Sequence, residues 1–227
     1  MSKQSLVKKF GRLYYLFYRI IHPCKISVQK GNRVELDKVF LNHCEIRITG
    51  SGNKLVVAPG FTRLSHCKIT VCGTDCEVVI GNYNNFHLSA FNVIGDGCRL
   101  IFGNGNTLRD NTYIEVSEGC RVVIGNDSLF ADDVQVRVSD WHSVLDKDTG
   151  KRINPSKDVV LGDRIWIANS ATIHKGVVLS DDTIVGAKAF VTSGTYPPNS
   201  ILAGVPAKVV KQNVCWDSEL LPMDGQQ

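Results

Sequence analysis

The chain of 227 residues is 43% apolar and 21% charged, a composition typical of a globular protein with one hydrophobic core. Its formal net charge of +4 is unevenly distributed, because residues 1–30 contain seven Lys and Arg side chains and no acid. The other 197 residues carry 19 basic and 22 acidic side chains, a charge of −3, which argues against nucleic acid as the main partner.

The first 30 residues form a basic segment with the pattern of an amphipathic helix. Between residues 4 and 21 apolar side chains recur at helical spacing, and they are Leu6, Phe10, Leu13, Phe17 and Ile21. We expect this helix to cover one end of the fold or to rest on an anionic membrane. The apolar run is interrupted by Arg19 and is too short to cross a bilayer, and no secretory signal pattern is present. The sequence therefore predicts a cytoplasmic protein and allows peripheral contact with the inner face of the membrane.

Residues 31–138 contain a repeat of 22 residues. Cys76, Cys98 and Cys120 are separated by 22 positions, and the segments that begin at them read CEVVIGN, CRLIFGN and CRVVIGN. Weaker copies begin at Asn32 and Asn53. A fixed period of this length is typical of a solenoid, in which each repeat forms one coil and equivalent residues stack along the axis.

The cysteines and histidines of these coils are expected to be structural. Several of the eight cysteines fall at the repeat spacing and no CxxC pair is present, so we expect reduced thiols packed in the interior. His43, His66 and His87 are 23 and 21 residues apart and are expected to stack along one edge. Histidines in a row on one chain do not match the geometry of a three-histidine metal centre, so no metal is predicted.

Residues 139–158 interrupt the repeats with the polar loop SDWHSVLDKDTGKRINPSKD. A polar loop on a regular scaffold is a common place for catalytic residues. This loop contains His142, and an imidazole is well suited to take a proton from a hydroxyl. Asp140 is the nearest acid that could orient the histidine. Ser143 is not expected to act as a nucleophile, because adjacent residues rarely reach the geometry of a catalytic pair.

From residue 159 to residue 211 the sequence repeats every six residues, beginning VVLGDR, IWIANS and ATIHKG. The third position of six successive hexads is aliphatic, and the residues are Leu161, Ile167, Ile173, Leu179, Val185 and Val191. A period of six fits neither an α-helix nor a single strand, but it fits a coil of three short flat faces with one branched side chain per face pointing inward. Residues 212–227 form a C-terminal tail without this pattern.

The hexads, the WHS segment at 141–143, the IWIA element at 165–168 and the closing PPNSILAGVPAKVVK resemble the hexapeptide-repeat O-acetyltransferases. That family includes galactoside acetyltransferase-like enzymes and the O-acetyltransferases of bacterial capsule and surface polysaccharides. The resemblance is strong over residues 139–211 and only architectural before them. It implies an all-β fold, a parallel left-handed β-helix, with acetyl-CoA as the donor, a sugar hydroxyl as the acceptor and a homotrimeric assembly.

The resemblance also implies the residues of the site. A loop histidine acts as the base in this family, which corresponds to His142, and active sites lie between adjacent subunits. A tryptophan, small residues and lysines are expected to bind acetyl-CoA, and they are Trp166, Ala168, Gly186, Ala187, Lys188, Lys208 and Lys211. Many relatives have a polar residue where this chain has Val205, which removes a polar side chain near the adenosine end.

These expectations predict direct transfer without a covalent enzyme intermediate. His142 deprotonates the acceptor hydroxyl, the oxygen attacks the acetyl carbonyl, and backbone amides stabilise the oxyanion. Two alternatives stay open from the sequence. The same fold could acetylate the amine of a nucleotide sugar, or it could be a non-catalytic β-helix that serves as a scaffold or sugar-binding subunit.

Overall fold

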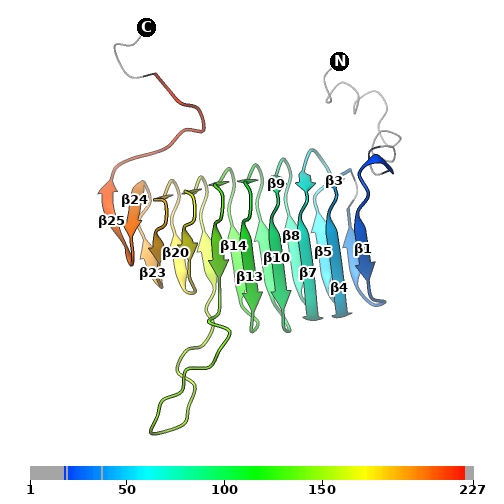
Figure 1. Ribbon diagram of the computed structural model, residues 1–227, viewed down its shortest axis with the longest axis horizontal. Helices are drawn as coiled ribbons and strands as arrows, with labels where there is room; N and C mark the ends of the chain where they lie inside the picture. Colours follow the sequence, from blue (N-terminus) through cyan, green and yellow to red (C-terminus); the bar gives the residue numbers. More distant parts are fainter. Residues whose placement is uncertain (1–17, 19, 37, 223–227) are drawn as a thin grey trace.

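The computed structural model describes residues 18, 20–36 and 38–222, and this part of the chain winds into a β-helix (Figure 1). Each coil contributes one strand to each of three sheets, and neighbouring coils pair in parallel. The exception is the last strand, which pairs antiparallel with the strand before it. The predicted all-β coil with three faces is confirmed.

The three sheets run along the whole body. Sheet A comprises β1 (Lys25–Val28), β4 (Glu45–Ser51), β7 (Lys68–Thr74), β10 (Ala90–Ile94), β13 (Tyr113–Ser117), β16 (Gln135–Arg137), β19 (Thr172–Ile173) and β22 (Phe190–Val191). Sheet B comprises β2 (Arg33–Glu35), β5 (Lys54–Val57), β8 (Glu77–Ile80), β11 (Arg99–Phe102), β14 (Arg121–Ile124), β17 (Val159–Leu161), β20 (Val177–Leu179) and β23 (Gly194–Tyr196). Sheet C comprises β3 (Phe40–Asn42), β6 (Arg63–Ser65), β9 (Asn85–His87), β12 (Thr107–Leu108), β15 (Leu129–Phe130), β18 (Trp166–Ile167), β21 (Ile184–Val185), β24 (Ser200–Gly204) and β25 (Ala207–Gln212).

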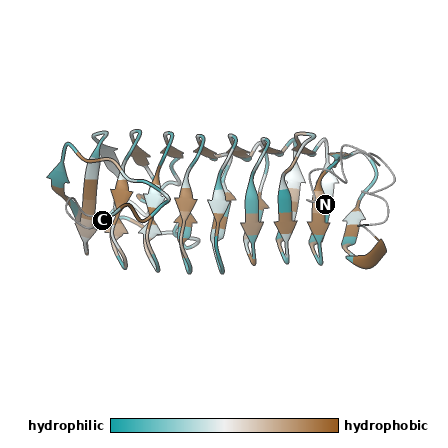
Figure 2. Ribbon diagram, turned by 90° about the horizontal axis from the view of Figure 1, so that it is seen from above, coloured by the Kyte–Doolittle hydropathy of each residue, from teal (hydrophilic) through white to brown (hydrophobic). Residues whose placement is uncertain are grey.

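The core lies between the three sheets, because alternate side chains of each strand point inward. All six aliphatic residues at the third hexad position are buried, as predicted. The first hexad position is buried as well, and its residues are Val159, Ile165, Ala171, Val177, Thr183 and Ala189. Each hexad therefore buries at least two side chains rather than the one expected from the sequence. In Figure 2 hydrophobic stretches recur from coil to coil along the body.

The coils have two widths. In sheet A, Tyr113 pairs with Gln135, which is 22 residues later, whereas Thr172 pairs with Phe190, which is 18 residues later. We call the coils up to residue 138 the wide coils and those from residue 159 the narrow coils. The wide coils enclose a contact group of three aromatic rings at centroid distances of 4.8–5.7 Å, formed by Phe86, Phe91 and Phe102.

The cysteines and histidines occupy the positions that the repeat predicts. The thiols at the repeat spacing are free and buried, and they are Cys44, Cys67, Cys76, Cys98 and Cys120. The rings of His43 and His66 are nearly parallel at 5.2 Å, and the ring of His87 lies 5.8 Å from that of His66. Both predictions are confirmed. Within the described ranges no group of three or more His, Cys, Asp or Glu residues is arranged to hold a metal ion.

The predicted helix of residues 4–21 lies almost entirely outside the described residues, as does its basic side chain Arg12. Within the part of the chain that is described, no helix has the length and apolar character needed to cross a membrane.

Candidate functional site

The loop of residues 139–158 leaves the body at the corner between sheets A and B. It connects β16 to β17 and projects away from the coils (Figure 1). The amide of Lys157 donates to the carbonyl of Val138 at 3.1 Å, which closes the base of the loop. Farther out, Leu145 and Arg152 form an antiparallel bridge, so the two arms of the loop hold each other. The loop is therefore a defined arm rather than an irregular excursion.

The neighbouring wide coil braces the loop. Both terminal nitrogens of Arg152 donate to the carboxylate of Glu118, at 3.0 and 2.8 Å, and this pairing lowers the pKa of Glu118. The carboxylate of Asp158 accepts from the backbone amide of Arg121 at 2.9 Å and from its Nε at 2.8 Å. Bidentate pairs of this kind restrict orientation as well as distance. Two arginine–carboxylate pairs therefore join the loop to this coil.

The neighbouring narrow coil braces the loop through Asp140. The Nζ of Lys175 donates to Oδ2 of Asp140 at 2.5 Å, and Nε2 of His174 lies 3.3 Å from Oδ1. The Lys175 ammonium holds the pKa of Asp140 below its usual range. Burial lowers the pKa of His174, although the Asp140 carboxylate acts in the opposite direction. Asp140 was predicted as the acid that orients His142, but its carboxylate contacts His174 and Lys175. Its backbone carbonyl, not its carboxylate, accepts a hydrogen bond from the amide of His142.

His142 has an exposed imidazole on a backbone that is held from both sides. Its amide donates to the carbonyl of Asp140 at 2.8 Å, and its own carbonyl accepts from Nδ2 of Asn154 at 2.8 Å. The Asn154 side chain also donates to Oδ2 of Asp140 at 2.7 Å and accepts from the amide of Val144 at 2.7 Å. One amide side chain therefore fixes the turn that carries the histidine, while the imidazole stays accessible to a substrate.

Asn154 and Lys175 were not among the residues selected from the sequence. Asn154 precedes a proline in a polar loop, where an asparagine is usually explained by local turn geometry. Lys175 occupies an ordinary outward hexad position. The sequence offered one signal for each residue. Asn154 lies near the end of the loop, and Lys175 lies at a corner of the coil that follows it.

A second group of predicted residues lies on the outer face of sheet C. Trp166 is half-buried and sits in register between Leu129 and Ile184. Beside this row the hydrogen bonds from Ala168 to Val185 and from Gly186 to Leu202 align small residues on successive coils. We call this row of small residues beside the Trp166 indole the sheet C track.

The predicted lysines lie at the C-terminal end of this track. Lys208 and Lys211 are exposed on β25 and pair with Ala203 and Ile201 of β24. Lys188 is exposed, with a φ of 58°, at the corner that follows β21, directly after the exposed Ala187. Val205, in the turn between β24 and β25, is 75% exposed. Positive charge is therefore concentrated at one end of the sheet C face.

The structure brings the sheet C residues together but keeps them apart from His142 within one chain. The loop departs from the corner between sheets A and B, and sheet C forms the side opposite that corner. A molecule lying on the sheet C track of one chain therefore lies on the other side of the body from the same chain's histidine.

Glu115 is a buried acid near the loop that was not selected from the sequence. Its side chain is fully buried on β13, Oε1 accepts from the hydroxyl of Ser117 at 2.5 Å, and Oε2 has no hydrogen-bond partner among the described residues. Burial raises the pKa of Glu115, with Ser117 and Arg137 opposing the shift. An outward-facing position on a strand rarely becomes fully buried, and the loop beside it provides the cover.

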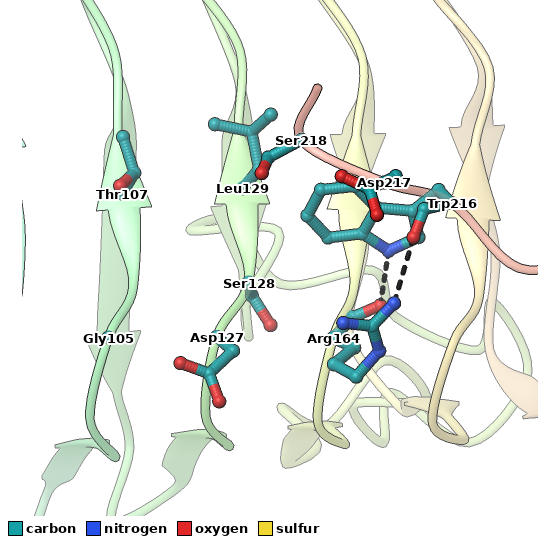
Figure 3. Close-up of a pocket in the computed structure, with 9 residues that line it drawn as sticks. All are labelled: Gly105, Thr107, Asp127, Ser128, Leu129, Arg164, Trp216, Asp217 and Ser218. Carbon is teal, nitrogen blue, oxygen red and sulfur yellow. Dashed lines mark hydrogen bonds between the residues drawn. The ribbon is translucent and has the colours of Figure 1, made fainter. Parts of the chain in front are cut away.

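The C-terminal tail crosses the outer face of sheet C. Nε1 of Trp216 donates to the carbonyl of Arg164 at 2.6 Å, and a terminal nitrogen of Arg164 donates to the carbonyl of Trp216 at 2.8 Å (Figure 3). The indole lies 6.1 Å from that of Trp166. The tail thus adds a second tryptophan beside Trp166. This residue was not predicted, because the tail has no repeat pattern from which its position could be inferred.

No family model matches the chain. Segments of it are similar to curated proteins: 35% identity over 54 residues with galactoside O-acetyltransferase of Escherichia coli (24% of this chain, 26% of that protein), and 31% over 77 residues with polysialic acid O-acetyltransferase of Escherichia coli O1:K1 (34% and 25%). The matched segments span about a quarter of these relatives' length. The crystal structure of the polysialic acid O-acetyltransferase OatWY superposes with a TM-score of 0.77 at 24% identity, covering 88% of this chain and 93% of that chain.

The resemblance predicted from the sequence is therefore confirmed. Both of these curated relatives are O-acetyltransferases by name, and the fold over nearly the whole chain is that of the hexapeptide-repeat left-handed β-helix.

Proposed function

We propose that the protein is an acetyl-CoA-dependent O-acetyltransferase that acts on a sugar hydroxyl of a bacterial surface polysaccharide or its precursor. The observation that carries the proposal is the rigidly braced turn that presents the exposed imidazole of His142, held by Asn154 and by the Asp140–Lys175 pair. Similarity of segments to named sugar and polysaccharide O-acetyltransferases supports the same reaction class.

The sheet C track suits the donor. The small residues Ala168 and Gly186 allow a long flexible thioester arm to approach the backbone closely. Trp166 offers an apolar edge to that arm, and Lys188, Lys208 and Lys211 offer positive charge to the phosphates. The exposed Val205 leaves the adenosine end without a polar side chain at that turn.

The reaction proceeds by direct attack. His142 takes the proton of the acceptor hydroxyl as its oxygen forms a bond to the acetyl carbon. Backbone amides of the assembled site stabilise the negative charge on the carbonyl oxygen. The carbon–sulfur bond then breaks, and the imidazolium returns its proton to the departing CoA thiolate. Asp140 acts on this step through the turn rather than through the imidazole ring.

Catalysis requires a second copy of the chain, because His142 and the sheet C track lie on opposite sides of one body. A homotrimer allows the loop of one copy to reach the track of the next. Sheet B offers a surface for this assembly, since half-buried β-branched residues align on its outer face over six coils, namely Val56, Val79, Ile101, Val123, Val160 and Val178. Sedimentation of the wild type and Val123→Lys tests this, with dissociation expected in the variant.

The experiment that tests the function is release of free CoA thiol from acetyl-CoA with a panel of surface glycans, nucleotide sugars and simple glycosides. Acceptor-dependent release with a hydroxyl-only glycan is the expected result. Release only with an amino-sugar nucleotide would identify an N-acetyltransferase instead. A folded trimer that neither binds acetyl-CoA nor releases thiol would support the non-catalytic scaffold.

A further inference from the structure

A pocket of about 340 Å³ lies where the C-terminal tail crosses sheet C, beside Trp166 and toward the wide coils. The coils contribute one wall and the tail the other (Figure 3). The lining includes Thr107, Asp127, Leu129, Trp216, Asp217 and Ser218. Because the tail is part of the wall, this pocket is distinct from the open track that continues past Trp166.

The wall formed by the C-terminal tail is held against the coils by hydrogen bonds. Trp216 and Arg164 exchange two hydrogen bonds, at 2.6 and 2.8 Å, and the guanidinium lies 5.6 Å from the centre of the Trp216 ring. The six-membered ring of the indole points toward the strand of Leu129 in Figure 3. Trp216 and Leu129 therefore present apolar surface on adjoining sides of the pocket.

Two of the polar groups that line the pocket are carboxylates. Asp127 and Asp217 both line it, and in the described part of the chain neither carboxylate has a cation within ion-pair distance. Among the described residues that line the pocket Arg164 is the one base, and its Nε lies 2.7 Å from Oδ1 of Asp182, which offsets its charge. Asp127 is held in place over Gly105, where a side chain larger than hydrogen would collide with its Oδ1.

The two ends of the sheet C face therefore carry opposite charge. Carboxylates on the wide-coil side of Trp166 disfavour the phosphates of the donor, and lysines at the opposite end attract them. The thioester end of the donor then lies nearer Trp166, and the acidic pocket lies beyond it. A molecule in the pocket is placed to present a group to the acetyl carbon.

We propose that this pocket is the acceptor subsite and that it takes a neutral sugar residue rather than a carboxylated or phosphorylated one. The inference rests on the proposed function. Trp216 and Leu129 cover the C–H face of the ring, and Asp127, Asp217 and the hydroxyls of Thr107 and Ser218 bond its hydroxyl groups. A carboxylated sugar would bring a third negative charge into a pocket whose guanidinium, Arg164, is already paired with Asp182 and the carbonyl of Trp216.

The first test is direct binding of methyl galactoside and methyl glucoside, and of their uronic acid counterparts, without acetyl-CoA. The wild type is expected to bind the neutral glycosides at least about tenfold more tightly, since 1.4 kcal/mol corresponds to a factor of ten. Asp127→Asn combined with Asp217→Asn is expected to remove most of this preference. Tighter binding of the uronic acids by the wild type would overturn the proposal.

The second test separates acceptor from donor. Trp216→Ala is expected to raise KM for a neutral acceptor about tenfold and to leave KM for acetyl-CoA within about twofold, as loss of one stacking surface predicts. Trp216→Phe should restore most of the acceptor affinity, and Leu220→Ala, at a fully exposed tail position, is the matched control. A Trp216→Ala variant in which only the acetyl-CoA KM rises would contradict the assignment.

The two proposals fail separately. If no glycan supports thiol release while neutral glycosides still bind in a Trp216-dependent way, the sugar subsite stands and the transferase proposal is wrong. If transfer occurs but the double Asn variant and Trp216→Ala leave acceptor binding unchanged, the transferase stands and the subsite is wrong.

Discussion

The wide coils and the narrow coils share the same three-sided cross-section but differ in the side chains that fill it. The extra residues of each wide coil lengthen the strands of sheet A, so that β7 has seven residues and β22 has two. The wider interior accommodates the ring cluster of Phe86, Phe91 and Phe102, whereas the narrow interior is filled by aliphatic and small side chains. Coil length therefore sets how large the core residues can be, because a close-packed interior leaves no voids.

The functional loop lies at the junction between the two regions. A wide coil holds it through Glu118, and a narrow coil holds it through Lys175. The track with the lysines belongs to the narrow coils, and the acidic pocket begins where the wide coils meet them. Each region is regular by itself, and the candidate functional residues lie where the two regions meet.

The largest effect is expected from His142→Ala, which tests the junction directly. Removing a general base lowers turnover by roughly 10²–10⁴-fold. The melting temperature should not change, because the imidazole is exposed. Thiol release and thermal unfolding measure the two quantities, with Ser143→Ala as the neighbouring control. Turnover close to that of the wild type would remove His142 from the mechanism.

The cores of the two regions are compared by Phe102→Ala and Ile173→Ala. A buried Phe→Ala change costs about 3–5 kcal/mol and a buried Ile→Ala change about 2–5 kcal/mol. Because each coil contacts only its neighbours, the loss of hydrogen-exchange protection should stay within the region that carries the substitution. Uniform loss of protection along the body after either change would show that the regions unfold as one unit.

Asn154→Ala is expected to loosen the turn without removing the base. A misplaced catalytic group can cost on the order of 10²-fold, so we expect turnover to fall by about 10–100-fold with KM for acetyl-CoA unchanged. Thr149→Ala removes another hydrogen bond of the same loop, to Asp146, and is the matched control. Equal losses in both variants would mean that Asn154 has no special role.

The smallest effect concerns Glu115. Its pKa in the folded protein lies above its ordinary value of 4.5, so above that pH the unfolded chain loses the proton first and stability falls as the pH rises toward the folded pKa. Glu115→Gln removes this dependence. The melting temperature of the variant relative to wild type should therefore increase between pH 4 and pH 7. A difference that stays constant over this range would show that Glu115 titrates normally.

Much of the fold could be predicted because it depends on spacing. The aliphatic row that includes Ile167 and Ile173, and the histidine stack of His43 and His66, follow from periods that bring equivalent positions onto successive coils. The second buried position of each hexad was not predicted because it mixes aliphatic residues such as Ile165 with Ala171 and Thr183, so it forms no uniform aliphatic row.

The candidate site was predictable only in part. His142 and Trp166 stood out by residue type and motif, but their partners did not. Lys175 reaches Asp140 across 35 residues, and Arg164 reaches Trp216 across 52. Such pairs form only when the coils stack or the tail crosses them, so no local pattern marks either partner.

The β-helix, its two repeat lengths, the buried thiols and the loop that interrupts the coils can be predicted from the order of residues, because they follow from the repeat pattern and its interruption. Three features are visible only in the folded chain: Asn154 and Lys175 hold the histidine turn, the loop and the sheet C track face away from each other, and the tail encloses an acidic pocket. These features depend on contacts between distant residues, whose geometry is set by the stacking of the coils.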